Sequence, residues 1–559
     1  MEKRTIVAIL LCLAIWLVWQ HFFMEVPKPP ARPDGGQPAA EAVDKSQEKK
    51  DHQAKAVETE PQTERLEEKL VSLRTELFEA TFTTRGAALK SLKLLEFKER
   101  DENKKPEELG REDLVSTTDE PLLPLTLVFD PEKTSFKWPK VTDWAVEQEG
   151  KGFVRMRYQH PSDQNIPVIT KTYRLSDQVY QLDVEVELHN RSGSSIDEQV
   201  GLSTFGSFQA PATTGCMGPP SAPRQPMCLA GEEKLEVDPK PGEASIGKPN
   251  VLWTGINEQY FLTAIIPIGV EESICKLEAS HDKVLSSTLV YSDTVIPPGG
   301  AAKHRFRVYA GPKQMKIMEE VTGGKDGKRP AKLTTSVDYG WFSFLCHPML
   351  WLLKVFYSVV GNYGLAIIFL TIVVKILLLP LTQKSMQSMR EMAKLKPLME
   401  DLKKRFGDDK QRLNQEMMNL YKTHKINPMG GCFPMLLQMP IWIALYRTLY
   451  SSVELYQAPF IPGWLDDLSY RDPYFIMPLV LGGTMFLQQK LSPTTADTQQ
   501  AKMMMYMMPA FFTFIMLYLP SGLVLYIFVN SLLSIGHQLL YNRMKSVPSV
   551  AVEDRSPET

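Results

Sequence analysis

The chain has 559 residues, a net charge of −2 and 43% hydrophobic residues. This length exceeds that of one ordinary domain and predicts several structural units. The near-neutral charge excludes a global basic field of the kind that recruits nucleic acid, so we expect no direct DNA partner. The six cysteines show no metal-ligand spacing, and we expect neither a metal nor another cofactor.

The first 24 residues have the composition of a membrane-spanning helix. Lys3 and Arg4 precede an apolar run that ends near Met24, and its length of about 20 residues suits one bilayer crossing. Because no small-x-small cleavage site follows, residues 1–24 predict an uncleaved signal-anchor helix, with a cleaved signal peptide as the alternative. Residues 25–65, which are rich in proline and charge, predict a disordered linker.

Residues 66–335 have the pattern of an antiparallel β sandwich. Short stretches such as Phe153–Tyr158 and Tyr180–Leu188 alternate apolar and polar residues, and turn residues separate them. No nucleophile with a base at motif spacing stands out, so we expect a binding or scaffold module and no enzyme. Cys216 and Cys228 are a candidate disulfide pair if this region is periplasmic.

The remaining chain holds almost every other long apolar run. Residues 336–354 are aromatic and amphipathic, and they predict an interfacial helix that Pro348 breaks. Residues 355–543 predict a core of five membrane spans with a charged helical hairpin at 384–427, and 544–559 form a tail. With the N-terminal helix, the sequence predicts a polytopic α-helical membrane protein of six spans that carries an all-β sandwich domain.

The distribution of basic residues predicts the orientation of these spans. The 384–427 segment holds many lysines and arginines, whereas the 453–473 segment has only Arg471 among four acidic residues. The positive-inside rule therefore predicts that the hairpin and both termini are cytoplasmic and that the β domain is periplasmic.

One ionisable residue lies well inside an apolar run. Lys375 is in the first core span, and an ionisable residue there costs roughly 2.5–3.5 kcal/mol on insertion scales. Thr371 lies one helical turn earlier and continues a polar stripe. This pattern favours a functional cation in a polar cavity. The alternative is a lysine that extends its amine to the lipid headgroups.

Many short motifs in the second half resemble one known family. They include Gly361-Asn-Tyr-Gly364, Pro380-Leu-Thr382, Asn427-Pro-Met-Gly-Gly-Cys-Phe-Pro434, Gln438-Met-Pro440 and Pro520-Ser-Gly-Leu-Val-Leu-Tyr526. Together they are similar to the bacterial YidC membrane protein insertases of the YidC/Oxa/Alb group, densely over residues 337–543. The preceding β domain resembles the large periplasmic domain of the Gram-negative members.

The resemblance implies insertion and folding of hydrophobic segments of nascent membrane proteins in the inner membrane, alone or with the Sec translocon and its accessory subunits. It implies a cytoplasm-open hydrophilic groove with a basic residue, contact of the cytoplasmic loops with ribosomes, and contact with membrane lipids. Lys375 stands where the family usually has arginine. Lysine keeps the charge but lacks the bidentate fork. The other positions implied are Thr371, Gln438 and Asn530 as polar lining and Pro434, Met439, Pro440 and Met507 as a substrate slide.

A transporter or channel with a periplasmic binding domain is the alternative function, because such proteins also place charged residues in spans. It predicts discontinuous helices in two repeated halves, and the sequence shows no such repeat.

Overall fold

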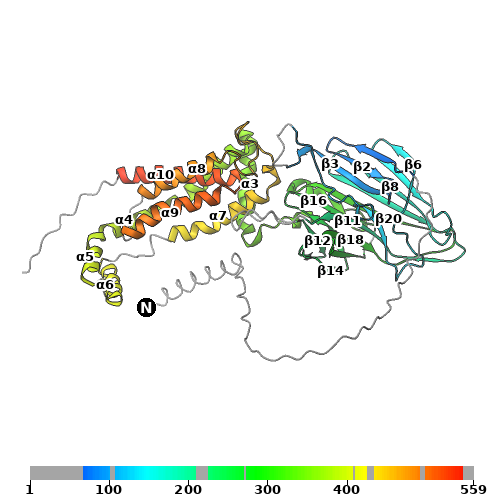
Figure 1. Cartoon of the computed structure of the whole chain (residues 1–559), viewed down its shortest axis with the longest axis horizontal. Coiled ribbons are helices and arrows are strands. Elements are labelled where there is room, and N and C mark those ends of the chain that lie inside the picture. Colours follow the sequence, from blue (N-terminus) through cyan, green and yellow to red (C-terminus); the bar gives the residue numbers. More distant parts are fainter. Residues whose placement is uncertain are drawn as a thin grey trace, which may run out of the picture. The chain divides into compact units, whose positions relative to one another are not determined.

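A computed structural model of the chain describes residues 67–100, 108–208, 224–247, 249–269, 272–406, 409–424, 433–491 and 498–544 (Figure 1). The expected signal-anchor helix at 1–24, the linker at 25–65, Cys216 and the tail beyond Met544 lie outside these residues.

The strands of the β domain (residues 67–330) form antiparallel sheets. The nine-stranded sheet has the order β13 (Glu233–Glu236), β12 (Gln225–Ala230), β15 (Val251–Asn257), β16 (Phe261–Ile268), β20 (Ala301–Pro312), β9 (Gln181–His189), β8 (Val168–Leu175), β7 (Phe153–Tyr158) and β6 (Ala145–Gly150). The five-stranded sheet has the order β14 (Ala244–Ile246), β17 (Ser273–Ala279), β18 (Val284–Tyr291), β11 (Val200–Ser207) and β5 (Thr126–Phe129).

Three smaller sheets complete the domain. They consist of β1 (Leu70–Arg74), β2 (Phe78–Thr83), β3 (Ala88–Lys98) and β4 (Arg111–Asp113), of β10 (Ile196–Glu198) with β19 (Thr294–Ile296), and of β21 (Thr322–Gly323) with β22 (Arg329–Pro330). The β-rich nature expected from the sequence is confirmed.

Alternating burial explains why these stretches form strands. In β9 the side chains of Leu182, Val184, Val186 and Leu188 are buried, while the residues between them are not, as a sheet with one covered face requires. The five-stranded sheet packs through β17 and β18 on β12 and β15 of the nine-stranded sheet. Phe82 of β2 stacks on Tyr173 of β8 at 4.2 Å between ring centroids.

The disulfide differs from the expected pair. Cys228 of β12 is bonded to Cys275 of β17, so the bond joins the two large sheets. The prediction of a Cys216–Cys228 bridge is wrong, because it relied on closeness in sequence, whereas sheet packing brings together residues that are 47 positions apart.

The second half of the described chain is helical. After α2 (Met315–Glu320) come α3 (Ser343–Val360), α4 (Tyr363–Lys394), α5 (Lys396–Phe406), α6 (Lys410–Thr423), α7 (Phe433–Ser451), α8 (Ile476–Leu491), α9 (Thr498–Met516) and α10 (Ser521–Met544). Among the described residues, three segments are long and apolar enough to cross a membrane by length and composition: Gly340–Val360, Tyr363–Lys394 and Ser521–Arg543.

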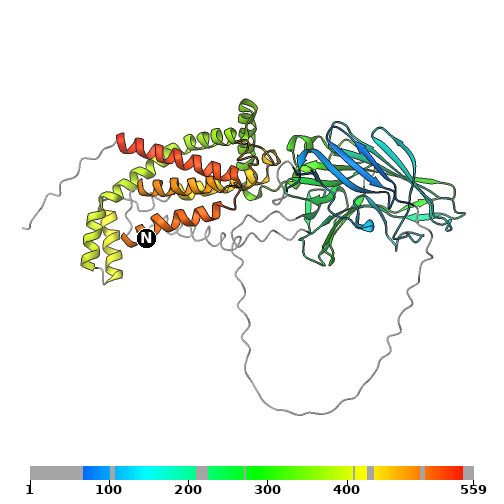
Figure 2. The same cartoon turned by 45° about the horizontal axis from the view of Figure 1, so that its top comes forward.

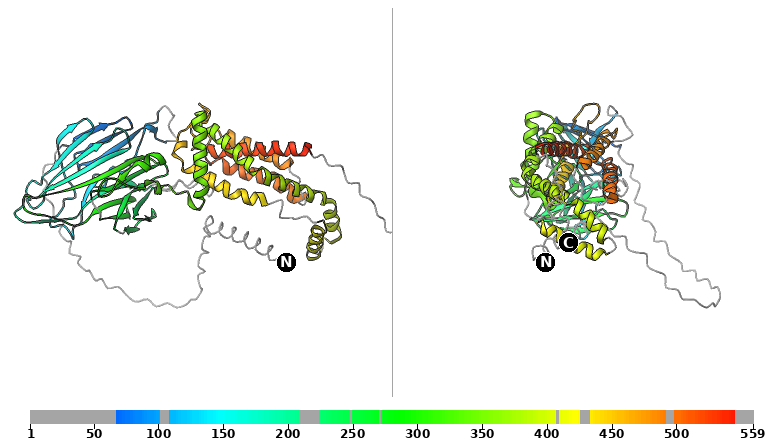
Figure 3. Two further views of the ribbon diagram at one scale, coloured as in Figure 1. Left: turned by 180° about the vertical axis from the view of Figure 1, so that it is seen from behind. Right: turned by 90° about the vertical axis from the view of Figure 1, so that its left-hand side faces the viewer.

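Helix α3 is longer than the sequence predicts. It continues past residue 354 to Val360 and runs through Pro348, so the expected break there is wrong. Gly361 ends the helix with a φ of +65°, a conformation that glycine adopts without a steric penalty. In Figures 2 and 3, α3 runs across the direction of α4 and α10. One face packs on the bundle through Leu353, while the indole of Trp351 is exposed.

Helices α5 and α6 lie side by side beyond the end of α4 (Figure 2). The Tyr421 hydroxyl of α6 donates to the Met399 sulfur of α5 at 3.8 Å. Helix α4 ends at Lys394, and after Leu395 the chain continues as α5, whose second residue is Pro397. Proline fits the first turn of a helix because its missing amide would have no intrahelical partner there.

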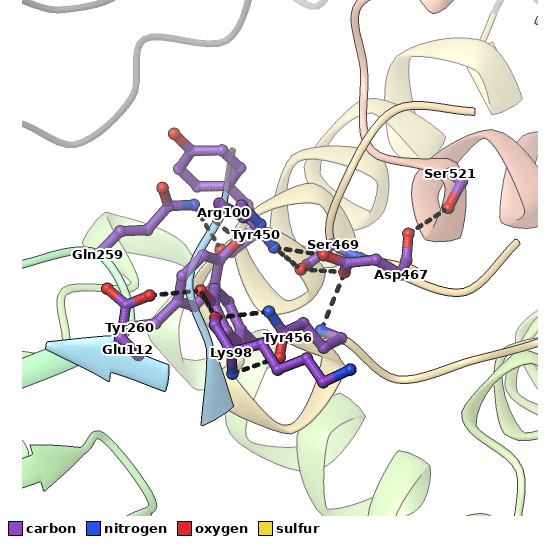
Figure 4. Close-up of polar contacts among 11 residues, drawn as sticks. Lys98, Arg100, Glu112, Gln259, Tyr260, Tyr450, Tyr456, Asp467, Ser469 and Ser521 are labelled. Carbon is purple, nitrogen blue, oxygen red and sulfur yellow. Dashed lines mark hydrogen bonds and ion pairs between the residues drawn. The ribbon is translucent and has the colours of Figure 1, made fainter. Parts of the chain in front are cut away.

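The loop between α7 and α8 (residues 452–475, hereafter the α7–α8 loop) packs on the β domain. Val453 and Tyr456 belong to the apolar core of that domain. The Gln457 side-chain amide donates to the Lys98 carbonyl at 2.7 Å and accepts from the Lys98 amide at 2.9 Å (Figure 4). The Tyr456 hydroxyl contacts the Glu112 carboxyl at 3.2 Å. We call this set of contacts the junction.

We predict that the junction is more stable in acid than in alkali. Burial, with a contribution from the nearby Glu258 carboxylate, raises the pKa of Glu112 to about 7 from 4.5. The raised pKa means that the folded state holds the proton more tightly than the unfolded state. The contribution of Glu112 to stability therefore falls by up to about 3 kcal/mol as pH rises from about 4.5 to about 7, and it is constant at higher pH. Thermal unfolding in detergent at pH 5 and pH 8 measures this difference.

Glu112→Gln should remove most of this pH dependence, because the amide cannot lose a proton. Glu319→Gln, a change of an exposed residue in α2, is the matched control and should leave the dependence in place. An unchanged pH dependence in Glu112→Gln would show that another group causes it.

Candidate functional site

The site is built around Lys375, the lysine within the apolar part of α4. Lys375 is half-buried, and its ammonium donates to the Ser534 hydroxyl at 2.5 Å and to the Asn530 side-chain oxygen at 3.3 Å. Both partners are on α10 and lie one turn apart, so they share a face of that helix. Since both are neutral, they satisfy donors of the ammonium without cancelling its charge.

The structure brings together some of the predicted polar residues and not others. Asn530 contacts Lys375 directly. Gln438 of α7 is half-buried and is hydrogen-bonded to Tyr526, one turn before Asn530 on α10. Thr371 is buried, and its hydroxyl donates to the Ile367 carbonyl of its own helix at 2.6 Å. The Thr371 hydroxyl is therefore committed within α4 and makes no hydrogen bond to Lys375.

Two polar residues of α10 were missed in the sequence. Ser534 donates to the Asn530 carbonyl at 2.7 Å while accepting from Lys375. The half-buried His537 lies one turn further, and neither ring nitrogen has a hydrogen-bond partner among the described residues. The signal that could have found them is the spacing 530, 534 and 537, which places three polar groups on one face of an apolar helix.

We predict that Ser534→Ala weakens the hold on Lys375 more than it weakens the fold. A hydrogen bond to a charged group contributes about 1.5–3 kcal/mol, and the methyl side chain cannot replace it. The measurement is the rate at which an amine-reactive probe labels Lys375 in membranes, followed on the peptide that contains this residue, and this rate should rise several-fold. Ser531→Ala, one turn before Ser534 but buried, is the control. Equal labelling of wild type and Ser534→Ala would contradict the prediction.

The predicted slide residues lie on two helices. On α7, Met439 is 38% exposed and Pro440 is half-buried, whereas Pro434 belongs to the helix but its side chain lies outside the described residues. On α9, Met507 is 58% exposed. Phe511 and Phe514 follow at helical spacing and are also about half exposed, so they extend one apolar stripe.

Within the described ranges between residues 67 and 544, no three His, Cys, Asp or Glu side chains come together as a metal-binding group. The site consequently consists of a cation, neutral hydrogen-bonding groups and exposed apolar side chains.

Comparison with known proteins identifies the family. Residues 70–352 match the family described as YidC periplasmic domain, and residues 355–548 match the family described as 60Kd inner membrane protein. A membrane protein insertase YidC from Anaeromyxobacter sp. (strain K) is 39% identical over 499 residues, which is 87% of each chain. The membrane protein insertase YidC of Geotalea daltonii is 33% identical over 98% of this chain and 100% of its own.

The chain belongs to the YidC family of membrane protein insertases. The resemblance inferred from the short motifs is thereby confirmed, and the transporter alternative is not favoured. A crystal structure described as an active YidC insertase with its first transmembrane domain resolved is 18% identical, with a TM-score of 0.38, and covers 85% of this chain and 92% of its own. Family membership extends across the periplasmic β domain and the membrane-associated helices alike.

Proposed function

We propose that this protein inserts hydrophobic segments of nascent membrane proteins into the bacterial inner membrane and helps them to fold. The observation that carries this proposal is the Lys375 ammonium, held inside an apolar helix by two neutral groups. Such a cation attracts the acidic segment that a substrate must pass across the membrane, because opposite charges attract strongly where the effective dielectric constant is low.

The polar face around Lys375 shortens the apolar distance that this segment crosses. Gln438, Asn530 and Ser534 supply hydrogen-bonding groups in the bundle, and a polar tail that contacts them loses less hydration than one that meets hydrocarbon. The membrane potential then drives acidic residues outward. Residues of the tail leave the site, while the adjoining apolar segment remains in the membrane.

The apolar segment leaves sideways along α7 and α9. The exposed side chains of Met439 and Met507 supply flexible thioethers, which adapt to substrates of different shape. Phe511 and Phe514 continue this surface along α9. An apolar helix moving along the stripe exchanges contacts with side chains for contacts with lipid at little change in free energy.

The proposed topology has six spans with both termini in the cytoplasm. The N-terminal helix and the segments containing α4, α7, α8, α9 and α10 are the spans, and α3 lies at the periplasmic interface. The positive charges of α5 and α6 support a cytoplasmic hairpin that meets ribosomes. The Sec translocon, its accessory subunits and membrane lipids are the other proposed partners, with the β domain in the periplasm.

The test is reconstitution of the full-length protein in proteoliposomes that carry a membrane potential. A single-span substrate is supplied with an acidic, a neutral or a basic outer tail of equal length, and protection of the tail from external protease measures insertion. We expect the insertion rate to be highest for the acidic tail, lower for the neutral tail and lowest for the basic tail. Equal insertion of all three, or insertion in protein-free liposomes at the same rate, would overturn the proposal. Ion flux without insertion would support a channel instead.

A further inference from the structure

One cation of the β domain reaches across the junction. Arg100 lies two residues after the end of β3. Its guanidinium donates to the Asp467 carboxylate at 2.8 Å and also to the Ser469 hydroxyl (Figure 4). Its central carbon lies 4.4 Å from the ring centroid of Tyr456 and between 5 and 6 Å from those of Tyr260 and Tyr470. Three aromatic faces and one carboxylate therefore surround a single guanidinium.

This arrangement is selective for arginine. A planar guanidinium can stack on aromatic rings and donate in its own plane at the same time, whereas an ammonium is a compact point charge. The rings come from both sides of the junction, since Tyr260 belongs to the β domain and Tyr456 and Tyr470 belong to the α7–α8 loop. Removal of the cation would leave Asp467 facing aromatic rings without its partner.

Asp467 connects Arg100 to the loop and to α10. Its second carboxylate oxygen accepts from the Gln457 amide at 3.0 Å and from the Ser469 amide at 2.9 Å. Its backbone carbonyl accepts from the hydroxyl of Ser521, the first residue of α10, at 3.0 Å. The Asp467 carboxylate therefore links the β domain to the α7–α8 loop, and the Asp467 carbonyl links this loop to α10.

The start of α10 is fixed on this part of the loop by further contacts. The Ser521 amide donates to the Tyr470 carbonyl at 2.7 Å, and the Gly522 amide donates to the Leu468 carbonyl at 2.8 Å. A Cβ at Gly522 would lie 2.9 Å from that carbonyl oxygen, so the backbones approach as closely as glycine allows. A displacement of the loop must therefore displace the first turn of α10.

We propose that Arg100 is a positioning residue for the Lys375 site. Arg100 holds Asp467, Asp467 and its neighbours hold the first turn of α10, and the helix then sets Asn530 and Ser534 beside Lys375. The two partners of Lys375 lie nine and thirteen residues after Ser521 on one continuous helix, which transmits a shift of its first turn along its axis. The β domain thereby contributes to the site from outside the membrane. This proposal rests on the proposed function of Lys375.

The test uses full-length protein in proteoliposomes with Arg100→Ala, Arg100→Lys and, as a matched control, Arg191→Ala, which changes an exposed arginine elsewhere in the β domain. Hydrogen–deuterium exchange of residues 521–527 reports on the start of α10. We expect exchange there to accelerate at least tenfold in Arg100→Ala, less in Arg100→Lys and not at all in the control. Unchanged exchange of strand β9 shows that the β domain remains folded.

Insertion of the acidic-tail substrate separates a positioning role from a structural one. Arg100→Ala should lower the insertion rate several-fold in the wild-type background and cause no further loss in a Lys375→Ala background, because both changes act through one site. Unchanged exchange of α10 in Arg100→Ala, or losses that multiply in the double variant, would overturn the proposal. If Lys375→Ala alone inserts normally, the proposed function fails instead, and that failure is distinguishable because α10 exchange would still respond to Arg100→Ala.

Discussion

Lys375→Glu is expected to reduce insertion of an acidic-tail substrate by about a hundredfold, and Lys375→Ala by about tenfold, whereas Lys375→Arg retains most of the activity. A tenfold change corresponds to about 1.4 kcal/mol. Removing the charge removes the attraction, and reversing it adds repulsion of similar size. Arginine keeps the charge, and Asn530 and Ser534 can accept from its guanidinium as they accept from the ammonium.

The measurement is the initial rate of tail protection in proteoliposomes at matched protein density. Lys384→Ala, which removes an exposed lysine near the end of the apolar part of the same helix, is the matched control and should have little effect. A basic-tail substrate should invert the order of the variants, because Lys375→Glu then becomes the attracting one. Equal insertion rates for the wild type and the three Lys375 variants would mean that Lys375 only extends its amine to the lipid headgroups.

Loss of the Cys228–Cys275 bond is expected to destabilise the β domain by about 4 kcal/mol. The bond closes a loop of 47 residues, and in the chain-entropy view this restricts the unfolded state by about that amount. Because both cysteines are fully buried between the two large sheets, Cys228→Ala with Cys275→Ala also leaves space where the sulfurs were. Both effects act in the same direction.

Limited proteolysis of the full-length protein in detergent measures this change as earlier cleavage of the β domain in urea. Reductant should reproduce the effect in the wild type and add nothing to the double variant. Cys346→Ala, which removes a buried free thiol in α3, is the control and should leave β-domain cleavage unchanged. If the reduced wild-type protein is cleaved at the same urea concentration as the oxidised protein, the predicted contribution of the disulfide to stability is contradicted.

Local periodicity explains which parts of the fold could be predicted from the sequence. The alternation in β9 and the apolar run of α4 each specify an element without reference to the rest of the chain. The sequence predicts an interfacial helix that ends at residue 354 and breaks at Pro348, whereas α3 continues to Val360 without a break. In the structure, the helix runs through Pro348 in its second turn and lacks there the one hydrogen bond that an amide at this position would donate to the Phe344 carbonyl.

Contacts between distant segments explain the rest. Cys228 meets Cys275, and Arg100 meets Asp467, only after sheets and loops have packed, and neither pairing leaves a local pattern. Lys375 was found from its charge in an apolar run, but Ser534 gained its role from the packing of α10 on α4. For Thr371 the helical spacing correctly predicts a position one turn from Lys375. It could not reveal that the Thr371 hydroxyl donates to the Ile367 carbonyl of its own helix.

The length of α4 has a mechanical consequence. Its 32 residues extend roughly 48 Å, whereas the hydrocarbon core of a bilayer is about 30 Å thick, so in the proposed topology the end of the helix that leads to α5 projects beyond the membrane. Lys375 lies about 18 Å along this rod, and Pro380 follows five residues later, where one backbone hydrogen bond is missing. The helix therefore bends most easily at Pro380, so a displacement of α5 and α6 can be taken up there while the part that carries Lys375 stays packed on α10.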